Sequence, residues 1–343
     1  MLHPMRALLD VVDPWLPPSL LVDPWRLRIQ RLAERLPPAF GWGLFECRLG
    51  RGEPRVDFLV CASSRDGGRE ALRAAFKRKD KPANAAIEPA LDFVKAWSRE
   101  GSELYRGVPL IWLEYDLPPD QDPRPIVFPC IDPTYQSSRP VAALTPAELR
   151  IVAARALRLV LGREVSAAVL DTLVRCAELL PAGKKILALA ALPRRGPEDV
   201  RIYVSLRPAE VWPWLQAIGW PGPARLVDRG LKVVGSDTQL LGIHVDIAES
   251  VGPYFAAELY AGPSPAATAA GNRLLERLIR NGACDPDKGE AVARWTGDTK
   301  VDLPGAEWRI SVNRQFYLKV VPRLKGPHEA KAYLGFHPRF TLL

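Results

Sequence analysis

Hydrophobic and polar residues alternate in pairs of short segments, and segments with a helical period separate one pair from the next. The alternation is clearest from Arg201 to Leu206, where apolar residues occupy every second position. A period of two is typical of a strand that packs one face against a core. We interpret each pair as an antiparallel hairpin, and the five predicted pairs are residues 42–49 with 55–62, 108–116 with 125–130, 184–193 with 199–206, 239–248 with 252–261, and 308–321 with 328–337.

Helices are predicted between the hairpins. Thr145, Pro146 and Glu148 form a capping-box pattern with proline at the first helical position, which indicates a helix start. Residues 1–23, in which aspartates stand among prolines, are expected to be irregular. One helix, residues 25–36, precedes the first hairpin, and the gaps are expected to contain helices at 67–77 and 84–97, 145–161 and 164–180, 208–218 and 223–234, and 266–281 and 286–295.

Ten consecutive antiparallel strands would leave two open edges if the sheet were flat, and helices on one side would cover only one of its faces. Closure of the sheet solves both problems. We therefore predict an α+β fold in which a closed ten-stranded antiparallel β-barrel is surrounded by a ring of helices, as five αββα units in a single domain over residues 1–343. A barrel of ten strands is wide enough to leave an interior cavity.

If the apolar face of each strand meets the helices, the opposite face lines the barrel interior. An open sheet with one face in water would show the same alternation, and this alternative remains open. Cations and tyrosines together would suit an anion beside a flat ring or a cation. The predicted inward-facing residues are Glu46, Arg48, Arg55, Asp57, Trp112, Glu114, Asp116, Arg201, Tyr203, Ser205, Arg207, His244, Asp246, Tyr254, Glu258, Tyr260, Tyr317, Lys319, Lys331 and Tyr333.

Composition and motifs exclude several functions. The chain has 47 Lys and Arg against 39 Asp and Glu, a net charge of +8 that suits an anionic ligand but decides little over 343 residues. It contains no phosphate-binding Gly-x-x-x-x-Gly-Lys loop, no Gly-x-Gly-x-x-Gly fingerprint and no Gly-x-Ser-x-Gly elbow. Its four histidines lack zinc-site spacing, and no Asp-Asp-x-x-Asp box is present, so we expect no metal site.

The remaining features concern partners and location. Five cysteines, odd in number and widely spaced, are interpreted as reduced core thiols. Carboxylates interleaved with the cations argue against nucleic-acid binding. The N-terminal segment lacks the basic start and apolar run of a signal peptide, and no apolar run approaches the roughly 18 residues of a membrane span, so we expect a cytoplasmic protein without membrane contact.

Three short motifs recur on the predicted inner face: Arg201-Ile-Tyr203, Tyr317-Leu-Lys319 and Lys331-Ala-Tyr333. Together with five successive αββα units, they resemble the ABBA-type, or PT-barrel, aromatic prenyltransferases, a soluble cytoplasmic family. The resemblance covers almost the whole chain. It implies transfer of an allylic prenyl group from its diphosphate to an indole or phenol acceptor, which is an amino acid, a peptide or a natural-product intermediate. The diphosphate is then a co-substrate, no cofactor is needed, Mg²⁺ is not obligatory, and the protein is a monomer or weak dimer.

The resemblance also implies roles for individual residues. The acceptor's N–H or O–H would be bound by Glu46, or else by Glu114, although either could instead be a structural partner of Arg48 or Arg55. His244, two residues from Asp246, would remove the ring proton. The diphosphate would be held by Arg48, Arg55, Arg201, Lys319 and Lys331, with Arg207 as a further candidate. The allylic cation would be shielded by Tyr203, Tyr254, Tyr260, Tyr317 and Tyr333.

The segment 184–193 departs from the family pattern, because it offers lysines only at its start and then Ile, Leu and Ala. The alternative function is therefore a non-catalytic barrel that binds a peptide or an aromatic metabolite in natural-product biosynthesis. Trp112 together with Asp246 and Glu258 would suit a basic, aromatic peptide.

Overall fold

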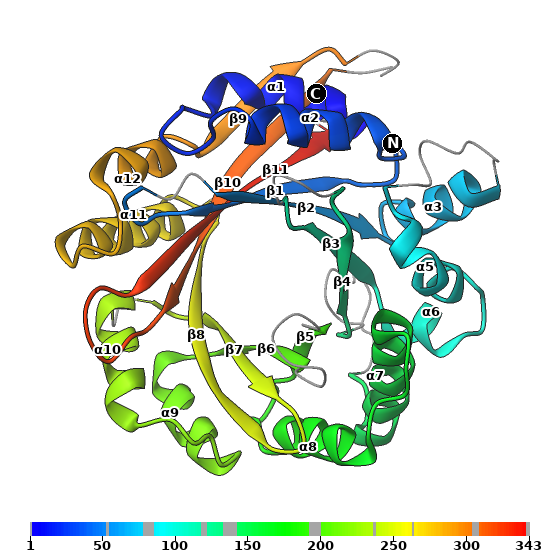
Figure 1. Cartoon of the computed structure of the whole chain (residues 1–343), viewed down its shortest axis with the longest axis vertical. Coiled ribbons are helices and arrows are strands. Elements are labelled where there is room, and N and C mark those ends of the chain that lie inside the picture. The colour runs from blue at the N-terminus through cyan, green and yellow to red at the C-terminus, as the bar shows by residue number, and fades with distance from the viewer. Residues whose placement is uncertain are drawn as a thin grey trace.

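The computed structural model describes residues 2–52, 55–77, 86–117, 122–132, 143–191, 200–235, 238–262, 264–303 and 309–340. Ten antiparallel strands form a closed barrel, with helices on its outside (Figure 1). Each strand pairs with its sequence neighbour, and β11 closes the barrel by pairing with both β10 and β1. The ten strands are β1 (Trp42–Arg48), β2 (Val56–Ser63), β3 (Leu110–Tyr115), β4 (Pro125–Cys130), β5 (Ile186–Ala191), β6 (Val200–Leu206), β7 (Leu241–Ile247), β8 (Val251–Ala261), β10 (Ile310–Val321) and β11 (Glu329–Phe340).

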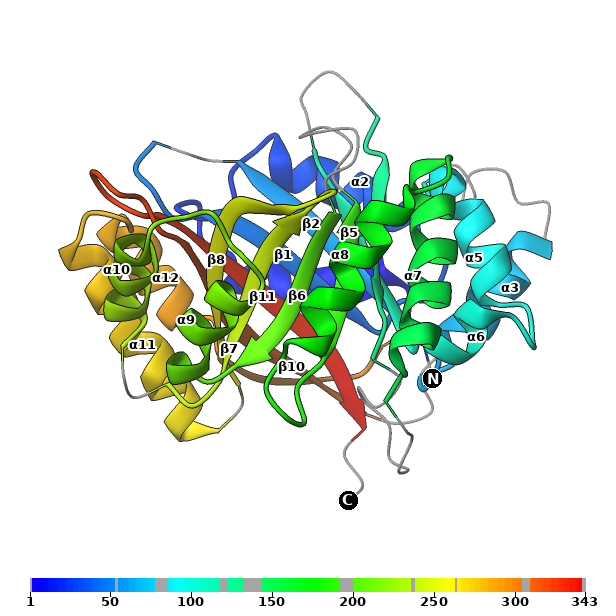
Figure 2. The ribbon, with the colours of Figure 1, turned by 90° about the horizontal axis from the view of Figure 1, so that it is seen from below.

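The closed barrel inside a layer of helices confirms the predicted fold class. Helices cover the outer face of the barrel, and the strands run obliquely beneath them (Figure 2). Thr145 makes both hydrogen bonds of the predicted capping box. The helices that the sequence predicted are α2 (Trp25–Arg35), α3 (Gly68–Lys77), α5 (Leu91–Trp97), α7 (Pro146–Leu161), α8 (Ala167–Glu178), α9 (Pro208–Ala217), α10 (Ala224–Val234), α11 (Pro265–Arg280) and α12 (Pro286–Ala293).

The structure corrects the expectation that residues 1–23 are irregular. They contain helix α1 (Met5–Val12), followed by the short 3-10 helix η1 (Asp13–Trp15). Met5, Leu8, Leu9 and Val12 are buried, and α1 packs against β10 and β11. The N-terminal segment therefore covers the strands that close the barrel.

Two further elements, helix α6 and strand β9, were not predicted. Helix α6 (Glu103–Gly107) follows α5, whereas the 3-10 helix η2 (Glu88–Ala90), which precedes α5, lies within the predicted helix 84–97. Strand β9 (Gly297–Val301) pairs with the first half of β10, whereas β8 pairs with the second half. The long β10 thus contacts two strands along one edge. The predicted turn of the third hairpin falls within 192–199, outside the described residues.

The two faces of each strand differ as the alternation predicts. On β6 and β7, the side chains of Ile202, Val204, Ile243 and Val245 are fully buried between the barrel and the helices. The residues between them on each strand project to the other side, into the interior of the barrel. Because β6 and β7 pair in register, Tyr203 lies opposite His244 there.

Candidate active site

A cavity of about 540 Å³ occupies the barrel interior, and all ten barrel strands or the residues next to them contribute to its wall. The closed barrel excludes the open-sheet alternative, because the polar faces of its strands meet across the interior cavity. One part of the wall is apolar, and it includes Leu44, Leu59, Phe128 and Cys130. The charged side chains and tyrosines of the remaining wall give the cavity a polar half and an apolar half.

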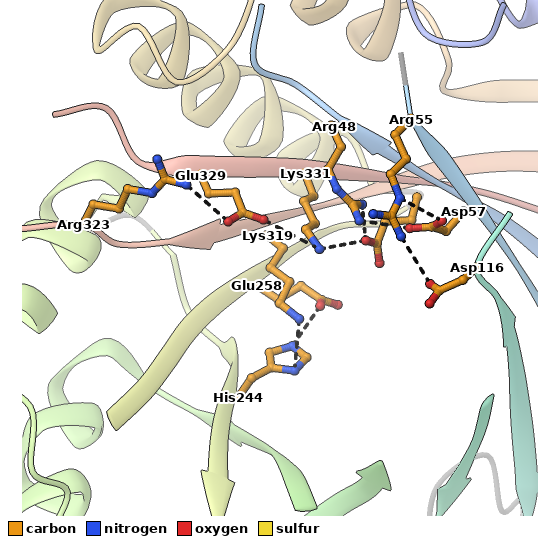
Figure 3. Close-up of polar contacts among 11 residues, drawn as sticks. Arg48, Arg55, Asp57, Asp116, His244, Glu258, Lys319, Arg323, Glu329 and Lys331 are labelled. Atoms are coloured by element: carbon orange, nitrogen blue, oxygen red, sulfur yellow. Dashed lines mark hydrogen bonds and ion pairs between the residues drawn. The ribbon is translucent and has the colours of Figure 1, made fainter. Parts of the chain in front are cut away.

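Three cations form a row across neighbouring strands. Arg48 on β1 lies opposite Lys331 on β11, and Lys331 lies opposite Lys319 on β10. Glu258 on β8 continues the row beyond Lys319. Figure 3 shows the three cationic side chains extending into the same region of the cavity. Antiparallel register alone therefore gathers positive charge at one level of the barrel.

Tyrosines form the adjacent row, two residues away along each strand. Tyr333 lies opposite Tyr317, and Glu46 lies opposite Tyr333 on the other side. Tyr317 and Tyr333 both line the cavity. The register thus places aromatic faces directly beside the row of cations, through the motifs Tyr317-Leu-Lys319 and Lys331-Ala-Tyr333.

Glu46 connects these two rows. Its carboxylate accepts a hydrogen bond of 2.8 Å from Lys331 Nζ and another from Arg48, whose guanidinium also donates to Asp57 at 2.9 Å. Burial alone would raise the pKa of Glu46, but Lys331 and Arg48 hold that pKa well below its usual range. Glu46 is therefore ionised and already bound to two cations. One of them is Arg48, the structural partner that the sequence analysis gave as an alternative to acceptor binding.

His244 lies between Lys319 and Glu258. Its Nε2 is 3.0 Å from Glu258 Oε2, and its Nδ1 is 3.4 Å from Lys319 Nζ. Burial, reinforced by Lys319 and Arg201, lowers the pKa of His244 well below its ordinary value, so the ring is neutral at pH 7. Lys319 can then donate to Nδ1, while Nε2 exchanges a proton with Glu258.

The other two members of this triad titrate near neutrality. Burial raises the pKa of Glu258 to about 7 despite the neighbouring Lys319. Burial and the charge of Arg201 lower the pKa of Lys319 to about 7. Lys319 and Glu258 can consequently take up or release a proton at small cost, and the neutral His244 ring lies between them. Glu258, rather than the predicted Asp246, is the carboxyl partner of His244.

Asp246 pairs instead with Arg201. The guanidinium donates two hydrogen bonds to Asp246, of 2.6 and 2.9 Å, and its carbon lies 3.6 Å from the centre of the Tyr254 ring. Arg201 lines the cavity, but Tyr254 does not. Tyr254 thus packs on a cation of the cavity wall, and its role as a shield of the allylic cation stays a prediction.

Two other predicted residues lie outside the cavity wall. The Tyr260 side chain is 44% exposed, packs on Tyr317 and donates a hydrogen bond to Gln315. Arg207 is exposed at the start of α9, where it pairs with Glu210. Both positions follow the alternation but lie too near a strand end to reach the enclosed space.

Tyr203 remains at the wall because β7 has a glycine beside it. A Cβ atom at Gly242 would lie 2.4 Å from the Tyr203 ring, closer than any contact allows. The absence of a side chain at Gly242 leaves room for the Tyr203 ring, whose centre lies 4.8 Å from that of His244 at an interplanar angle of 56°.

Glu114 projects from β3 into the cavity beside Trp112, which is two residues away on the same face. Burial raises the pKa of Glu114 to about 8, and Glu46 and Asp57 add to the effect by repulsion. Arg55 does not contact Glu114, because it pairs with Asp57 and, at 3.8 Å, with Asp116. Glu114 is thus a predominantly neutral carboxylic acid at pH 7.

The sequence interpretation missed the apolar wall. Phe128 lies opposite Trp112, and alternation along β4 already indicated that Phe128 and Cys130 share a face. Residues 187–190 all line the cavity. The β5–β6 register shifts between Ile186 and Ala188, so strict alternation already fails at the start of β5. No alternation pattern could have indicated consecutive lining residues.

In the part of the chain that the structure describes, no group of three or more His, Cys, Asp and Glu side chains is arranged to hold a metal ion. Across the same residues, no helix combines the length and apolarity needed to cross a bilayer.

The fold and site define an α+β barrel of the PT-barrel type, built around an enclosed chamber that combines cations, carboxylates and aromatic rings. No family model and no curated protein matches the sequence. Among solved structures, the chain is similar to 6-dimethylallyltryptophan synthase from Micromonospora olivasterospora in complex with DMASPP and Trp, with 15% identity, a TM-score of 0.47, and coverage of 97% of this chain and 95% of that chain.

A second similar structure is a 6-dimethylallyl tryptophan synthase, with 14% identity, a TM-score of 0.47, and coverage of 96% of this chain and 93% of that chain. At identities and scores this low, neither similarity carries an argument about this chain. The function has to be argued from the residues of the chamber.

Proposed function

We propose that the protein is an aromatic prenyltransferase, which transfers an allylic prenyl group from its diphosphate to an indole or phenol acceptor. One observation carries the proposal: Arg48, Lys331 and Lys319 form a row directly beside Tyr333 and Tyr317 in the cavity of the barrel. Cations bind a diphosphate, and tyrosine faces stabilise the carbocation formed when it leaves. Few other ligands need both kinds of group side by side.

In this reaction the cations would hold the diphosphate oxygens. As the bond between the prenyl carbon and oxygen breaks, the electron pair leaves with the diphosphate, and the growing negative charge is stabilised by Arg48, Lys319 and Lys331. Tyr203, Tyr317 and Tyr333 would face the allylic cation and exclude water that would otherwise trap it as an alcohol.

The acceptor ring would pack in the apolar half of the cavity, against Trp112 and Phe128. A ring carbon then forms a bond to the prenyl carbon, and the ring loses the proton from that carbon. His244 and Glu258 are placed to accept this proton, because the imidazole is neutral and hydrogen-bonds to the carboxyl group.

Activity tests use the purified chain with dimethylallyl or geranyl diphosphate and an acceptor: tryptophan, tyrosine, tryptamine or a tryptophan-containing peptide. The expected result is a product whose mass increases by one prenyl group, with and without EDTA. Lys331→Ala should abolish product formation, whereas Lys232→Ala on the exposed side of α10 should not. No prenylated product from any pair, in protein that is folded, would contradict the proposal.

A second candidate function is non-catalytic binding of a peptide or aromatic metabolite. The observation in its favour is that carboxylates already contact several chamber cations: Lys331 contacts Glu46, Arg48 contacts Glu46 and Asp57, and Arg201 contacts Asp246. Tight peptide binding together with failure of every prenyl diphosphate to bind would select this function.

A further inference from the structure

Glu114 differs from the other carboxyl groups of the cavity. Among the residues that the structure describes, Glu46, Asp57 and Asp116 each contact an arginine, and Glu258 contacts His244. Glu114 lines the same cavity but makes no hydrogen bond or ion pair with a described side chain. A carboxyl group that faces an enclosed space without a partner is available to a ligand.

The surroundings of Glu114 indicate the shape of that ligand. Trp112 lies on the same face of β3, Phe128 lies opposite Trp112 on β4, and Leu59 lies opposite Glu114 on β2. The wall therefore offers two aromatic rings and an aliphatic side chain next to one carboxyl group. A flat apolar ring that carries a single polar group fits this combination.

Electrostatics indicate the charge of the polar group. Burial raises the pKa of Glu114 to about 8, and repulsion from Glu46, Asp57 and Asp116 adds more to this rise than the neighbouring Lys331 removes. A cation beside Glu114 would reverse this effect, since it would favour the ionised carboxylate. A ligand carboxylate would meet the same repulsion as Glu114 itself.

We infer that Glu114 binds the protonated amine of an aromatic ligand whose ring packs on Trp112 and Phe128. The identification of this amine site with the acceptor site of the transferase rests on the proposed function. On that function, the acceptors are arylalkylamines. Amine binding itself requires no prenyl transfer, so it can be measured separately.

The test compares three ligands of similar shape by isothermal titration calorimetry at pH 7: tryptamine, which is a cation, 3-methylindole, which is neutral, and indole-3-acetate, which is an anion. We expect tryptamine to bind at least about tenfold more tightly than 3-methylindole, and indole-3-acetate to bind most weakly. Glu114→Gln should remove the preference for tryptamine and leave 3-methylindole binding unchanged.

Proton release provides a second readout. A carboxyl group with a pKa of about 8 is about nine-tenths protonated at pH 7, so binding of a cation that ionises it releases about 0.9 proton. Titrations in two buffers of different ionisation enthalpy measure this number. Glu114→Gln should release no proton on binding tryptamine.

Asp116→Asn is the matched control, because it removes a carboxylate that lies two residues further along the chain, just past the end of β3, and near Arg55. It should lower the proton release only slightly, because burial is the main cause of the raised pKa of Glu114, and it should weaken tryptamine binding by no more than about threefold. Equal binding of tryptamine and 3-methylindole would overturn the inference, as would an equal loss in the Asp116→Asn and Glu114→Gln variants.

The outcomes separate this inference from the proposed function. Amine selectivity without any prenylated product would contradict the transferase and leave the amine site intact. Prenylation of neutral indoles without amine selectivity would contradict the amine site and leave the transferase intact. Circular dichroism and thermal melting of each variant show that the comparison is made between folded proteins.

Discussion

Lys331 donates a 2.8 Å hydrogen bond to Glu46, although 285 positions separate the two residues in the sequence. The bond joins β11 to β1 inside the cavity, and burial of both partners strengthens it. A diphosphate that binds Lys331 must therefore compete with a carboxylate. The affinity of the chamber for an anion depends on the balance between these two interactions.

Glu46→Gln should increase the affinity for inorganic pyrophosphate by about tenfold, because it removes the negative charge that competes for Lys331 and Arg48. Lys331→Ala should decrease the affinity by a similar factor. Equilibrium titration at pH 7 measures both changes. Asp132→Asn is the control: Asp132 forms a comparable pair with Lys185, 2.9 Å long, away from the cavity wall. Unchanged affinity in both cavity variants would remove this pair from the anion site.

Diphosphate binding should depend on pH through Lys319. Its pKa is lowered to about 7, so the fraction of protonated amine falls about tenfold between pH 6 and pH 8. Lys319→Arg keeps a positive charge over this range. The affinity of Lys319→Arg for a non-hydrolysable prenyl diphosphate, divided by that of the parent protein, should rise about tenfold from pH 6 to pH 8. This ratio cancels the titration of the ligand, and a constant ratio would show that Lys319 does not bind the diphosphate.

Arg201 should contribute mainly to stability. Arg201→Ala leaves Asp246 charged and nearly buried, and should lower the free energy of unfolding by about 3 kcal/mol. Urea denaturation measures the change. Arg207→Ala, at the exposed position that follows β6, should lower the free energy of unfolding by less than about 0.5 kcal/mol. If Arg201→Ala changed diphosphate affinity but not stability, Arg201 would belong to the diphosphate site as the sequence suggested.

The tyrosines of the cavity should determine the fate of the allylic cation. Tyr317→Leu removes an aromatic face, so the proportion of prenyl diphosphate that ends as prenol should rise several-fold over prenylated acceptor. Tyr317→Phe should keep the original ratio. Tyr260→Leu should also keep it, because Tyr260 is half exposed outside the cavity wall. Chromatography of both products gives the ratio, and equal prenol yields from Tyr317→Leu and Tyr317→Phe would contradict the role.

The barrel could be predicted from the sequence because five hairpins follow one another with helices between them, and only closure satisfies their edges. The elements that were missed are short. Strand β9 has five residues and no apolar alternation, and it is held by the half of β10 that β8 does not cover. Helix α1 buries Met5, Leu8, Leu9 and Val12 at helical spacing. It was missed because it has only eight residues, is followed by prolines and lacks a capping side chain that would mark its start.

The inward-facing residues were predictable for the same reason, since alternation fixes the face of each strand. Their partners were not. His244 and Asp246 share a strand face, which favoured a pair between them, but the structure directs His244 to Glu258 and Asp246 to Arg201 on neighbouring strands. Such choices depend on register and side-chain orientation across strands, and residue order along one strand carries neither.

The pairing of β1 with β11 also has a consequence during synthesis. Until β11 has left the ribosome, β1 and β10 both present unpaired backbone groups that would otherwise bond to it. A polypeptide that lacked β11 would expose two unpaired strand edges and could not form the cavity. It would be prone to aggregate through these edges. Pairing of β11 thus removes the aggregation-prone edges and completes the ligand cavity in the same step.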